Sequence, residues 1–488
     1  MPFYDREEEL ASLEDAWRSG RAQWFVLWGR WRVGKTELLA HFLEGKRGLL
    51  FEAAEGTRLD QLLDFSAELG VASGNRLLLE QPLTTWQAAL TALDQFLAAG
   101  PAVVVIDEYQ RVKKAAPEIG SLLNTWWRAR GRGSQVCLVL SGSEVSFFQR
   151  ELLGVTATEY GRRTGQLQLT PFDYRAAGLF FPEWPAADRL RAYAVCGGMP
   201  YYLEQFDSGR SIPENILATV LYREGVMREE ARLLLHQELP DPAAHFSILR
   251  ALATGCTRIN EMVQRTGLDQ GAVVRSLDTL QSLFLVERTV PVTEANPSRT
   301  RRTRYRISDS YLDFWFRFVH PFQSRIETRD GARRHLEETV MPQLDHFVSR
   351  PAFERAAQTY LARAEPATAV GEWWGGVPVP RGIGSEERQV DAVAIDADRK
   401  VLALASCKWT SGPMDIGEEA LLTRLEPHIP GADGQPRHYF FSREGFAPAL
   451  QRLAGAHPER YRLVTPDDLY GPNAGRSARP RSGDHFGE

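Results

Sequence analysis

The chain has 488 residues, of which 43% are hydrophobic and 25% charged, and its formal net charge is −5 at pH 7. This length is too great for one hydrophobic core, and the composition excludes a disordered or fibrous protein. Because the net charge is slightly negative, any affinity for nucleic acid has to come from a local basic patch.

The cysteines and the apolar segments exclude further classes. The four cysteines lie far apart and form no C-x-x-C pair, which argues against a disulfide framework or a zinc ribbon. The N-terminal segment MPFYDREEELASLEDA is acidic and polar, unlike a secretory signal. Apolar runs such as AVVVI are far shorter than the roughly 20 residues that a membrane helix needs. We therefore expect a cytoplasmic protein with no membrane segment.

The first 172 residues predict an α/β core. Short apolar runs read as strands, and segments with apolar residues at i, i+3 and i+4 spacing read as the helices between them. The expected strands are 24–28, 48–53, 102–107, 135–141 and 166–169. Strands that alternate with helices predict a parallel sheet covered on both faces.

A phosphate-binding loop is predicted between the first strand and the first long helix. WGRWRVGKT has the skeleton G-x-x-x-x-G-K-T, with a strand before it and a helix after it. The backbone N–H groups and the helix N-terminus face the anion in such a loop, Lys35 reaches the β- and γ-phosphates, and Thr36 ligates Mg²⁺. Trp31 and Arg32 take free positions, with side chains pointing away from the phosphates. The residues expected to bind nucleotide are Gly29, Arg30, Trp31, Arg32, Val33, Gly34, Lys35, Thr36 and Glu37.

A second acidic signal supports the loop. The strand VVVIDEY ends in Asp107 and Glu108. We expect Asp107 to hold Mg²⁺ through water and Glu108 to orient or deprotonate the attacking water, which favours hydrolysis over binding alone. Ser141 or Ser143, after the next strand, is a candidate sensor of the terminal phosphate or a plain turn serine. The cofactors predicted are ATP and Mg²⁺.

Two arginines precede the last strand of this core. Arg162 or Arg163 is a candidate for neutralising charge on the transferring phosphoryl group, in the same chain or toward a neighbouring subunit of a homo-oligomer. The alternative for both is a surface ion pair.

The rest of the chain divides into four segments and a tail. Residues 173–238 have a helical pattern, and residues 239–310 read as three short helices followed by two strands, the pattern of a winged helix-turn-helix. A helical bridge over 311–350 leads to a second α/β region over 351–470. The polar tail, 471–488, is predicted to be disordered.

The expected wing is strongly basic, whereas the expected recognition helix, 269–283, has Arg275 as its one basic residue. The wing arginines are Arg299, Arg301, Arg302, Arg304 and Arg306. Five contacts with phosphates of duplex DNA would give a salt slope of roughly −4 to −5, with little sequence readout. The alternative is that this loop docks on an acidic face of its own protein.

Several motifs occur in the order of a known family. FYDREEEL, GRWRVGKTELL, VVVIDEYQ, LSGSEVSFF, YGRRTGQLQLTPF and CGGMPYYLEQF resemble archaeal-type P-loop ATPases of the AAA+/STAND kind. The resemblance continues through the winged helix and RISDSYLDFWFRFVHP to the family's C-terminal nuclease-like domain. It implies an AAA+-like P-loop NTPase core, a helical lid over 173–238, and an adenine contact near Arg6 and Glu8. The chain departs from the family at Asp5, where glycine is usual.

The C-terminal segment resembles PD-(D/E)xK nucleases, in which an Asp and an E-x-K pair on adjacent strands bind Mg²⁺. Asp391 and Lys408 suit that pattern, and Glu354 on the preceding helix is a further candidate ligand. Ser406, however, stands in the place of the middle carboxylate, and Gln389 stands where the family has Glu. A serine hydroxyl is a weak, neutral ligand. We favour a retained restriction-endonuclease-like α/β fold that grips DNA or a partner without cutting, with a live nuclease as the alternative.

The sequence leaves three functions open. We favour an ATP-hydrolysing regulator whose nucleotide state controls contact with duplex DNA through the winged helix, mainly at the phosphate backbone. The first alternative is an ATP-gated endonuclease that uses Asp391, Lys408 and Glu354. The second is a non-enzymatic nucleotide switch that binds a protein partner.

Overall fold

A computed structural model of the chain describes residues 4–129, 131–152, 163–239, 241–379 and 384–471. It separates into two compact units. The first comprises Met1–Pro171 with Met199–Tyr201, and the second comprises Phe172–Gly198 with Tyr202–Glu488. The segment expected as a lid, 173–238, therefore belongs to the second unit apart from residues 199–201.

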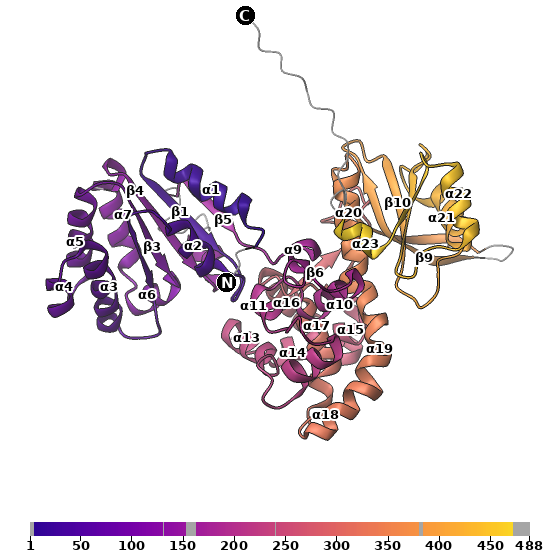
Figure 1. Ribbon diagram of the computed structural model, residues 1–488, viewed down its shortest axis with the longest axis horizontal. Helices are drawn as coiled ribbons and strands as arrows, with labels where there is room; N and C mark the ends of the chain where they lie inside the picture. The colour runs from indigo at the N-terminus through magenta and orange to yellow at the C-terminus, as the bar shows by residue number, and fades with distance from the viewer. Residues whose placement is uncertain (1–3, 130, 153–162, 240, 380–383, 472–488) are drawn as a thin grey trace, which may run out of the picture. The chain divides into compact units, whose positions relative to one another are not determined.

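The first unit is built on a five-stranded parallel sheet with the order β2-β3-β4-β1-β5 (Figure 1). Its strands are β1 (Gln23–Trp28), β2 (Gly48–Glu52), β3 (Ala102–Asp107), β4 (Val136–Gly142) and β5 (Gly165–Gln168), each within one residue of its predicted ends. β3 and β4 are buried over their whole length, as expected for parallel strands covered on both faces. The predicted α/β core with a parallel sheet is confirmed.

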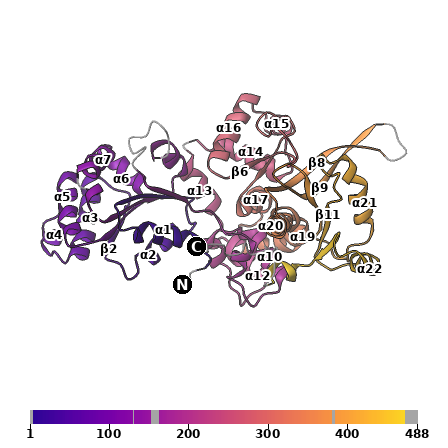
Figure 2. The same ribbon diagram turned by 90° about the horizontal axis from the view of Figure 1, so that it is seen from above.

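Helices cover both faces of this sheet. Figure 2 shows α1 and α2 on one face and α6 and α7 on the other. The helices are α1 (Glu7–Arg18), α2 (Lys35–Leu43), α3 (Arg58–Ser73), α4 (Leu77–Glu80), α5 (Trp86–Ala98), α6 (Tyr109–Ala115), α7 (Ile119–Ala129) and α8 (Val145–Phe147). Trp24 of β1 and Trp127 of α7 meet edge to face, with ring centroids 5.3 Å apart, and fix one helix layer on the sheet.

The strand order places the loop after β1 at a reversal of the sheet. β1 lies between β4 and β5, whereas the chain leaves β1 for the distant edge strand β2 and then returns. In open parallel sheets, such a reversal leaves a crevice beyond the carboxyl ends of the strands, where ligands bind. The ends of β1, β3 and β4 therefore frame one candidate site.

The second unit begins with helices. These are α9 (Tyr174–Gly178), α10 (Ala186–Cys196), α11 (Pro200–Glu204), α12 (Ile212–Asn215), the π-helical η3 (Ile216–Leu221) and α13 (Glu230–Glu238). They are followed by α14 (Ala243–Ala253), α15 (Ile259–Thr266), α16 (Gln270–Ser282) and the antiparallel strands β6 (Val286–Thr289) and β7 (Arg304–Ile307). Three helices and two strands thus occur in the order predicted for 239–310.

The segment expected as a bridge forms part of the core of the second unit. α17 (Ser310–Phe318) is buried along most of its length and packs against α10 and α14. It is followed by α18 (Arg329–His335), the π-helical η5 (Leu336–Val340), α19 (Met341–Val348), the π-helical η6 (Ser349–Glu354) and α20 (Arg355–Ala364). Because its aromatic side chains face neighbours on several sides, α17 joins segments that the sequence analysis had treated as separate domains.

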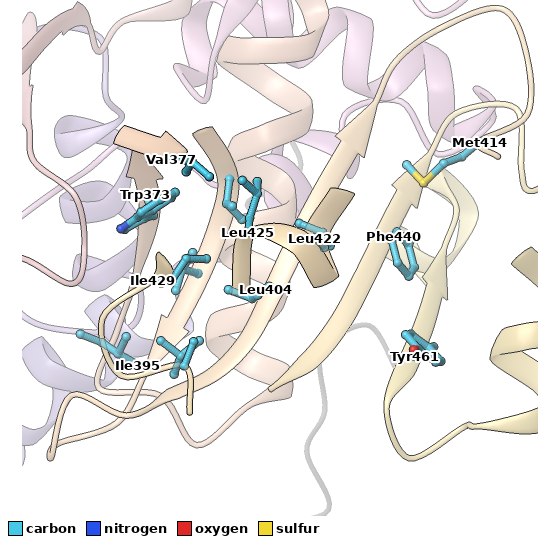
Figure 3. Close-up of a cluster of buried hydrophobic side chains, with 14 of the residues drawn as sticks. Trp373, Val377, Ile395, Leu404, Met414, Leu422, Leu425, Ile429, Phe440 and Tyr461 are labelled. Carbon is cyan, nitrogen blue, oxygen red and sulfur yellow. The ribbon is translucent and has the colours of Figure 1, made fainter. Parts of the chain in front are cut away.

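The C-terminal region is a mixed five-stranded sheet with the order β12-β11-β10-β9-β8. Its strands are β8 (Ala369–Pro378), β9 (Ser385–Ile395), β10 (Val401–Lys408), β11 (Arg437–Ser442) and β12 (Tyr461–Val464), and its helices are α21 (Gly417–Leu425), α22 (Pro448–Ala456) and α23 (Pro466–Tyr470). Strands β8, β9 and β10 pair antiparallel, and β10, β11 and β12 pair parallel. Figure 3 shows the buried cluster that joins this sheet to α21, including Leu404, Leu422 and Phe440.

None of the helices within the described residues is both long and apolar enough to cross a lipid bilayer. Two predictions fall outside those residues: Arg162 as a phosphoryl-transfer residue, and disorder of the tail from residue 472 onward.

Candidate functional site

The backbone between β1 and α2 requires glycine at both ends of the predicted phosphate loop. Gly34 has a φ of 90°, in the left-handed region where glycine carries no steric penalty. Gly29 lies against the end of β5, where a Cβ atom would stand 2.4 Å from the carbonyl oxygen of Leu169. The two glycines of the skeleton are therefore explained by the shape of the loop.

The bulky residues of the loop stack on one another. Arg32 has a φ of 64°, and its guanidinium carbon lies 4.1 Å from the ring centroid of Trp31 and 3.6 Å from that of Tyr201. Such cation–π contacts stabilise the loop. Of the other residues expected to bind nucleotide, Arg30 and Val33 are buried and Glu37 is exposed.

Lys35 and Thr36 open α2 on the inner side of the loop. Lys35 is 4% exposed, and its Nζ donates a hydrogen bond to the carbonyl oxygen of Arg30 at 3.1 Å. Thr36 Oγ1 donates to Asp107 Oδ2 at 2.6 Å, although the two residues are 71 positions apart. The fold thus brings the loop after β1 and the acid at the end of β3 into direct contact.

Glu108 lies next to this contact and is held by the end of β4. It is buried, has a φ of 52°, and accepts a hydrogen bond from Ser143 Oγ at 2.7 Å and another from Gln110 Nε2. Of the two candidate sensor serines, Ser143 therefore contacts the acidic pair, whereas the buried hydroxyl of Ser141 has no hydrogen-bond partner among the described residues. Gln110 was not predicted, because nothing in its sequence position marks it.

The carboxylates at this edge of the sheet carry excess negative charge. Glu52, at the end of β2, pairs in register with Asp107. Burial raises the pKa of Glu52, the charges of Asp107 and Glu108 raise it further, and Arg111 opposes the shift. A divalent cation relieves such repulsion between carboxylates. The residues present therefore fit Mg²⁺ in chemistry as well as position.

The N-terminal segment is fastened to the loop by Arg6. This buried side chain donates to the carbonyl oxygens of Val33 at 3.3 Å and Thr170 at 2.9 Å, and it pairs with Glu9 at 2.8 Å. Burial lowers the pKa of Arg6, and Glu9 partly restores it. The neighbouring Asp5 has a φ of 45°, which explains why glycine is usual at this position in the family that the sequence resembles.

Arg163 lies at the opposite edge of the sheet. It precedes β5, whose first residue pairs with Phe25 and whose last pairs with Trp28, beside the loop. Five residues of extended chain correspond to about 16 Å. Arg163 also donates to the carbonyl oxygen of Leu152 at 3.0 Å. A role for Arg163 in phosphoryl transfer, in its own chain or toward a neighbouring subunit, stays a prediction.

Two of the five wing arginines are held by the C-terminal sheet. Arg304 donates to Gln389 Oε1 at 2.8 Å and pairs with Glu387 at 2.5 Å. Arg306 is paired with the buried Glu372. Burial acts to lower the pKa of Arg306, but the charge of Glu372, followed by other acidic groups, raises it. These arginines follow the alternative weighed above, docking on an acidic face of their own protein.

The other three wing arginines differ in their surroundings. Arg302 donates to the carbonyl oxygen of Trp374 and lies 3.8 Å from Glu294. Arg299 and Arg301 are exposed, and neither makes an ion pair with any other described residue. Three of the five wing arginines thus contact other residues of the second unit, and contact of any of the five with phosphate stays a prediction.

Three of the predicted nuclease-like residues, Asp391, Ser406 and Lys408, lie on the adjacent strands β9 and β10, and Glu354 ends η6. Asp391 of β9 accepts a hydrogen bond from the backbone N–H of Cys407 in β10 at 2.8 Å. Glu354 is 9% exposed, and its Oε2 has no hydrogen-bond partner among the described residues. Burial, followed by the charge of Asp391, raises the pKa of Glu354 to about 8. Burial also raises the pKa of Asp391 to about 6, although Cys407 and Lys408 oppose the shift.

A carboxylate that the sequence analysis missed lies beside the serine. Ser406 Oγ donates to Glu418 Oε2 at 2.8 Å, and Lys408 Nζ pairs with Glu418 Oε1 at 3.1 Å. Glu418 stands in the first turn of α21, and only the path of the loop after β10 returns it to the strand. No local pattern could have indicated this contact.

The fold and the loop together define the first unit as a P-loop ATPase domain of the α/β class. Residues 3–206 match the family described as an ATPase domain predominantly from Archaea. Residues 315–419 match a second family, described as archaea bacterial proteins of unknown function.

Relatives resemble the chain over different lengths. An uncharacterized protein of Methanocaldococcus jannaschii, MJECL04, is 25% identical over 416 residues, covering 83% of this chain and 87% of the relative. An uncharacterized ATP-binding protein of the same organism, MJ0423, is 49% identical over 45 residues, covering 9% of this chain and 76% of the relative. Among solved structures, the Walker-type ATPase PABY2304 of Pyrococcus abyssi is 22% identical, with a TM-score of 0.49, covering 64% of this chain and 96% of the other.

Proposed function

We propose that the protein binds ATP with Mg²⁺ and hydrolyses it, and that the bound nucleotide controls contact of the second unit with duplex DNA. The observation that carries the hydrolytic part is the 2.6 Å hydrogen bond between Thr36 and Asp107, with Glu108 next to it. A hydroxyl, a carboxylate and a second carboxylate at the ends of parallel strands are the protein groups that metal-assisted phosphoryl transfer to water requires.

Each group has a distinct task. The backbone around Gly34 and the N-terminus of α2 would hold the phosphates, and Lys35 would exchange the carbonyl oxygen of Arg30 for phosphate oxygens. Thr36 and Asp107 would hold Mg²⁺, which neutralises charge on the phosphates when bound. Glu108 would then orient water and accept its proton, once its carboxylate turns away from Ser143.

A phosphate-release assay on the full chain tests this proposal. We expect Mg²⁺-dependent release from ATP, lost in Lys35→Ala. ATP binding without phosphate release in the wild-type protein would instead support the non-enzymatic switch. Absence of ATP binding by calorimetry would overturn the proposal altogether.

The DNA contact is proposed from the second unit. α14, α15 and α16 followed by β6 and β7 support a winged helix-turn-helix, and Arg299 and Arg301 on its ribbon are exposed. Two phosphate contacts correspond to a salt slope of roughly −2. Anisotropy with a fluorescent duplex at several salt concentrations should give that slope, and Arg299→Ala with Arg301→Ala should flatten it. An unchanged slope would argue against this ribbon as the contact.

A second candidate function is an ATP-gated endonuclease, and the position of Glu418 favours it. Glu418 would supply the carboxylate that Ser406 lacks, beside Asp391 and the buried Glu354. Among the described residues, no three acidic, histidine or cysteine side chains form a ready-made metal site. Metal binding would therefore require Glu418 to leave Ser406 and Lys408.

Plasmid cleavage with Mg²⁺ or Mn²⁺ tests the second candidate. Cleavage should be lost in both Asp391→Ala and Glu418→Gln. Glu419→Gln is the matched control, because Glu419 is adjacent but bonds to Tyr461 and Thr423 instead. Absence of cleavage by the wild-type protein with either metal would exclude the endonuclease and favour a nuclease-like fold that does not cut DNA.

A further inference from the structure

A cavity of about 370 Å³ lies in the second unit. Residues before and within α15, residues of β6 and β7, and residues of β8 and β9 line it. Its wall includes four arginines: Arg258, Arg304, Arg306 and Arg350. The wall also includes three glutamates: Glu261, Glu372 and Glu387. The excess of arginine favours an anionic ligand, because arginine hydrogen-bonds phosphate and carboxylate oxygens in a fixed planar geometry.

One carboxylate of the chain itself takes the place of such an anion. Glu387 Oε1 pairs with Arg304 at 2.5 Å, and Glu387 Oε2 pairs with Arg258 at 2.7 Å. A phosphodiester likewise presents two charged oxygens and one negative charge. Burial acts to raise the pKa of Glu387, but hydrogen bonds and charges from Arg304 and Arg258 outweigh it and lower the pKa. The side chain is 47% exposed, so solvent and ligands reach it.

Two of the cavity arginines have contacts with residues other than Glu387. Arg304 lies over the ring of Trp374 at 4.4 Å and is also bonded to Gln389, so its guanidinium has other supports. Arg306 is fixed by its buried ion pair with Glu372. Arg350 makes no ion pair with any other described residue. A ligand that displaced Glu387 would therefore meet at least two arginines, Arg304 and Arg306, that other residues hold in place.

We propose that this cavity binds the phosphodiester backbone of duplex DNA, and that Glu387 occupies the phosphate position in its absence. The inference rests on the proposed DNA contact and names a second place for it, beyond Arg299 and Arg301. Gln389, on the cavity wall, precedes Asp391 by two residues. Backbone bound here would thus pass close to the nuclease-like residues.

Removal of Glu387 should strengthen DNA binding by the full chain. In Glu387→Gln we expect roughly tenfold higher affinity for a short fluorescein-labelled duplex, measured by anisotropy. The salt slope should steepen by roughly 2, because Arg258 and Arg304 each gain a phosphate. Adding Arg258→Ala to Glu387→Gln should cancel about half of that steepening. Thermal unfolding of each variant shows that it is folded.

Glu386→Gln is the matched control. It removes the same charge one residue away, but Glu386 pairs with Arg388 and Arg424 and not with the cavity arginines. Equal gains in the two variants would mean that only net charge matters, and the inference would fall. If Glu387→Gln gains no DNA affinity while the wild type still binds DNA, the inference about the cavity is overturned and the proposed DNA contact through Arg299 and Arg301 is not. Binding by neither protein would overturn the proposed DNA contact as well.

Discussion

Glu108 is the residue on which the proposed hydrolysis depends, and two neighbours restrain it. Ser143 and Gln110 donate hydrogen bonds to its carboxylate, so the group is oriented but not free to accept a proton from water. A general base has to lie within hydrogen-bond reach of the proton that it removes. We infer that the bond from Ser143 has to break in each turnover.

Substitution of Glu108 should separate binding from hydrolysis. In Glu108→Gln we expect kcat for phosphate release to fall by roughly 10²- to 10³-fold, because the amide cannot accept the proton. ATP affinity, measured by calorimetry, should change little, since Lys35 and Thr36 are intact. Glu118→Gln, an exposed glutamate of the same unit that pairs with Arg58, is the control. Full activity in Glu108→Gln would assign the base to another residue.

Glu354 predicts an effect of pH on stability. Its pKa is about 8 in the fold, above the ordinary value of 4.5, so ionisation is disfavoured in the folded state. The free energy of unfolding should fall as pH rises from about 4.5 to about 8 and then level off. In Glu354→Gln we expect a gain of about 2 kcal/mol or more at pH 9 and little gain at pH 5. Urea unfolding in the presence of EDTA at both pH values measures the difference in free energy of unfolding between the variant and the wild type. An equal difference at pH 5 and pH 9 would contradict the prediction.

At the scale of elements, the first sheet was predictable because its central strands are continuous apolar runs. β3 and β4 are buried throughout, so their ranges follow from composition alone. The ion pairs of Arg304 and Arg306 were not predictable, because Glu387 and Glu372 lie more than 60 positions along the chain in a different sheet. The contact between Glu418 and Ser406 likewise depends on a loop whose path no local pattern determines.

The start of α16 offers a test of one element. Asp269 accepts a hydrogen bond from the backbone N–H of Ala272 at 2.9 Å and thereby caps the helix. In Asp269→Ala we expect a loss of about 1 kcal/mol in the free energy of unfolding. Asp278→Ala removes the same charge from the interior of α16 and should cost less. Similar losses in both variants would show that charge, and not the cap, stabilises this helix.

At the scale of the whole molecule, nucleotide binding and DNA binding are assigned to different units. If the bound nucleotide changes DNA affinity by a given factor, DNA must change nucleotide affinity by the same factor, because the two equilibria form one thermodynamic cycle. Calorimetry of Glu108→Gln with and without duplex DNA gives the factor by which DNA changes ATP affinity. That factor should equal the factor by which ATP changes the DNA affinity of the same variant. Unequal factors would mean that a third equilibrium, such as self-association, is involved.

The close approach of Gly29 to Leu169 bears on how the two units communicate. Thr170, the next residue, accepts a hydrogen bond from Arg6, which also bonds to Val33 within the loop. Two residues later, at Phe172, the chain passes into the second unit. Arg6 thus links the loop to the peptide that leaves the first unit. A small displacement of the loop on nucleotide binding would therefore also displace residues 169–172, which connect the first unit to the second.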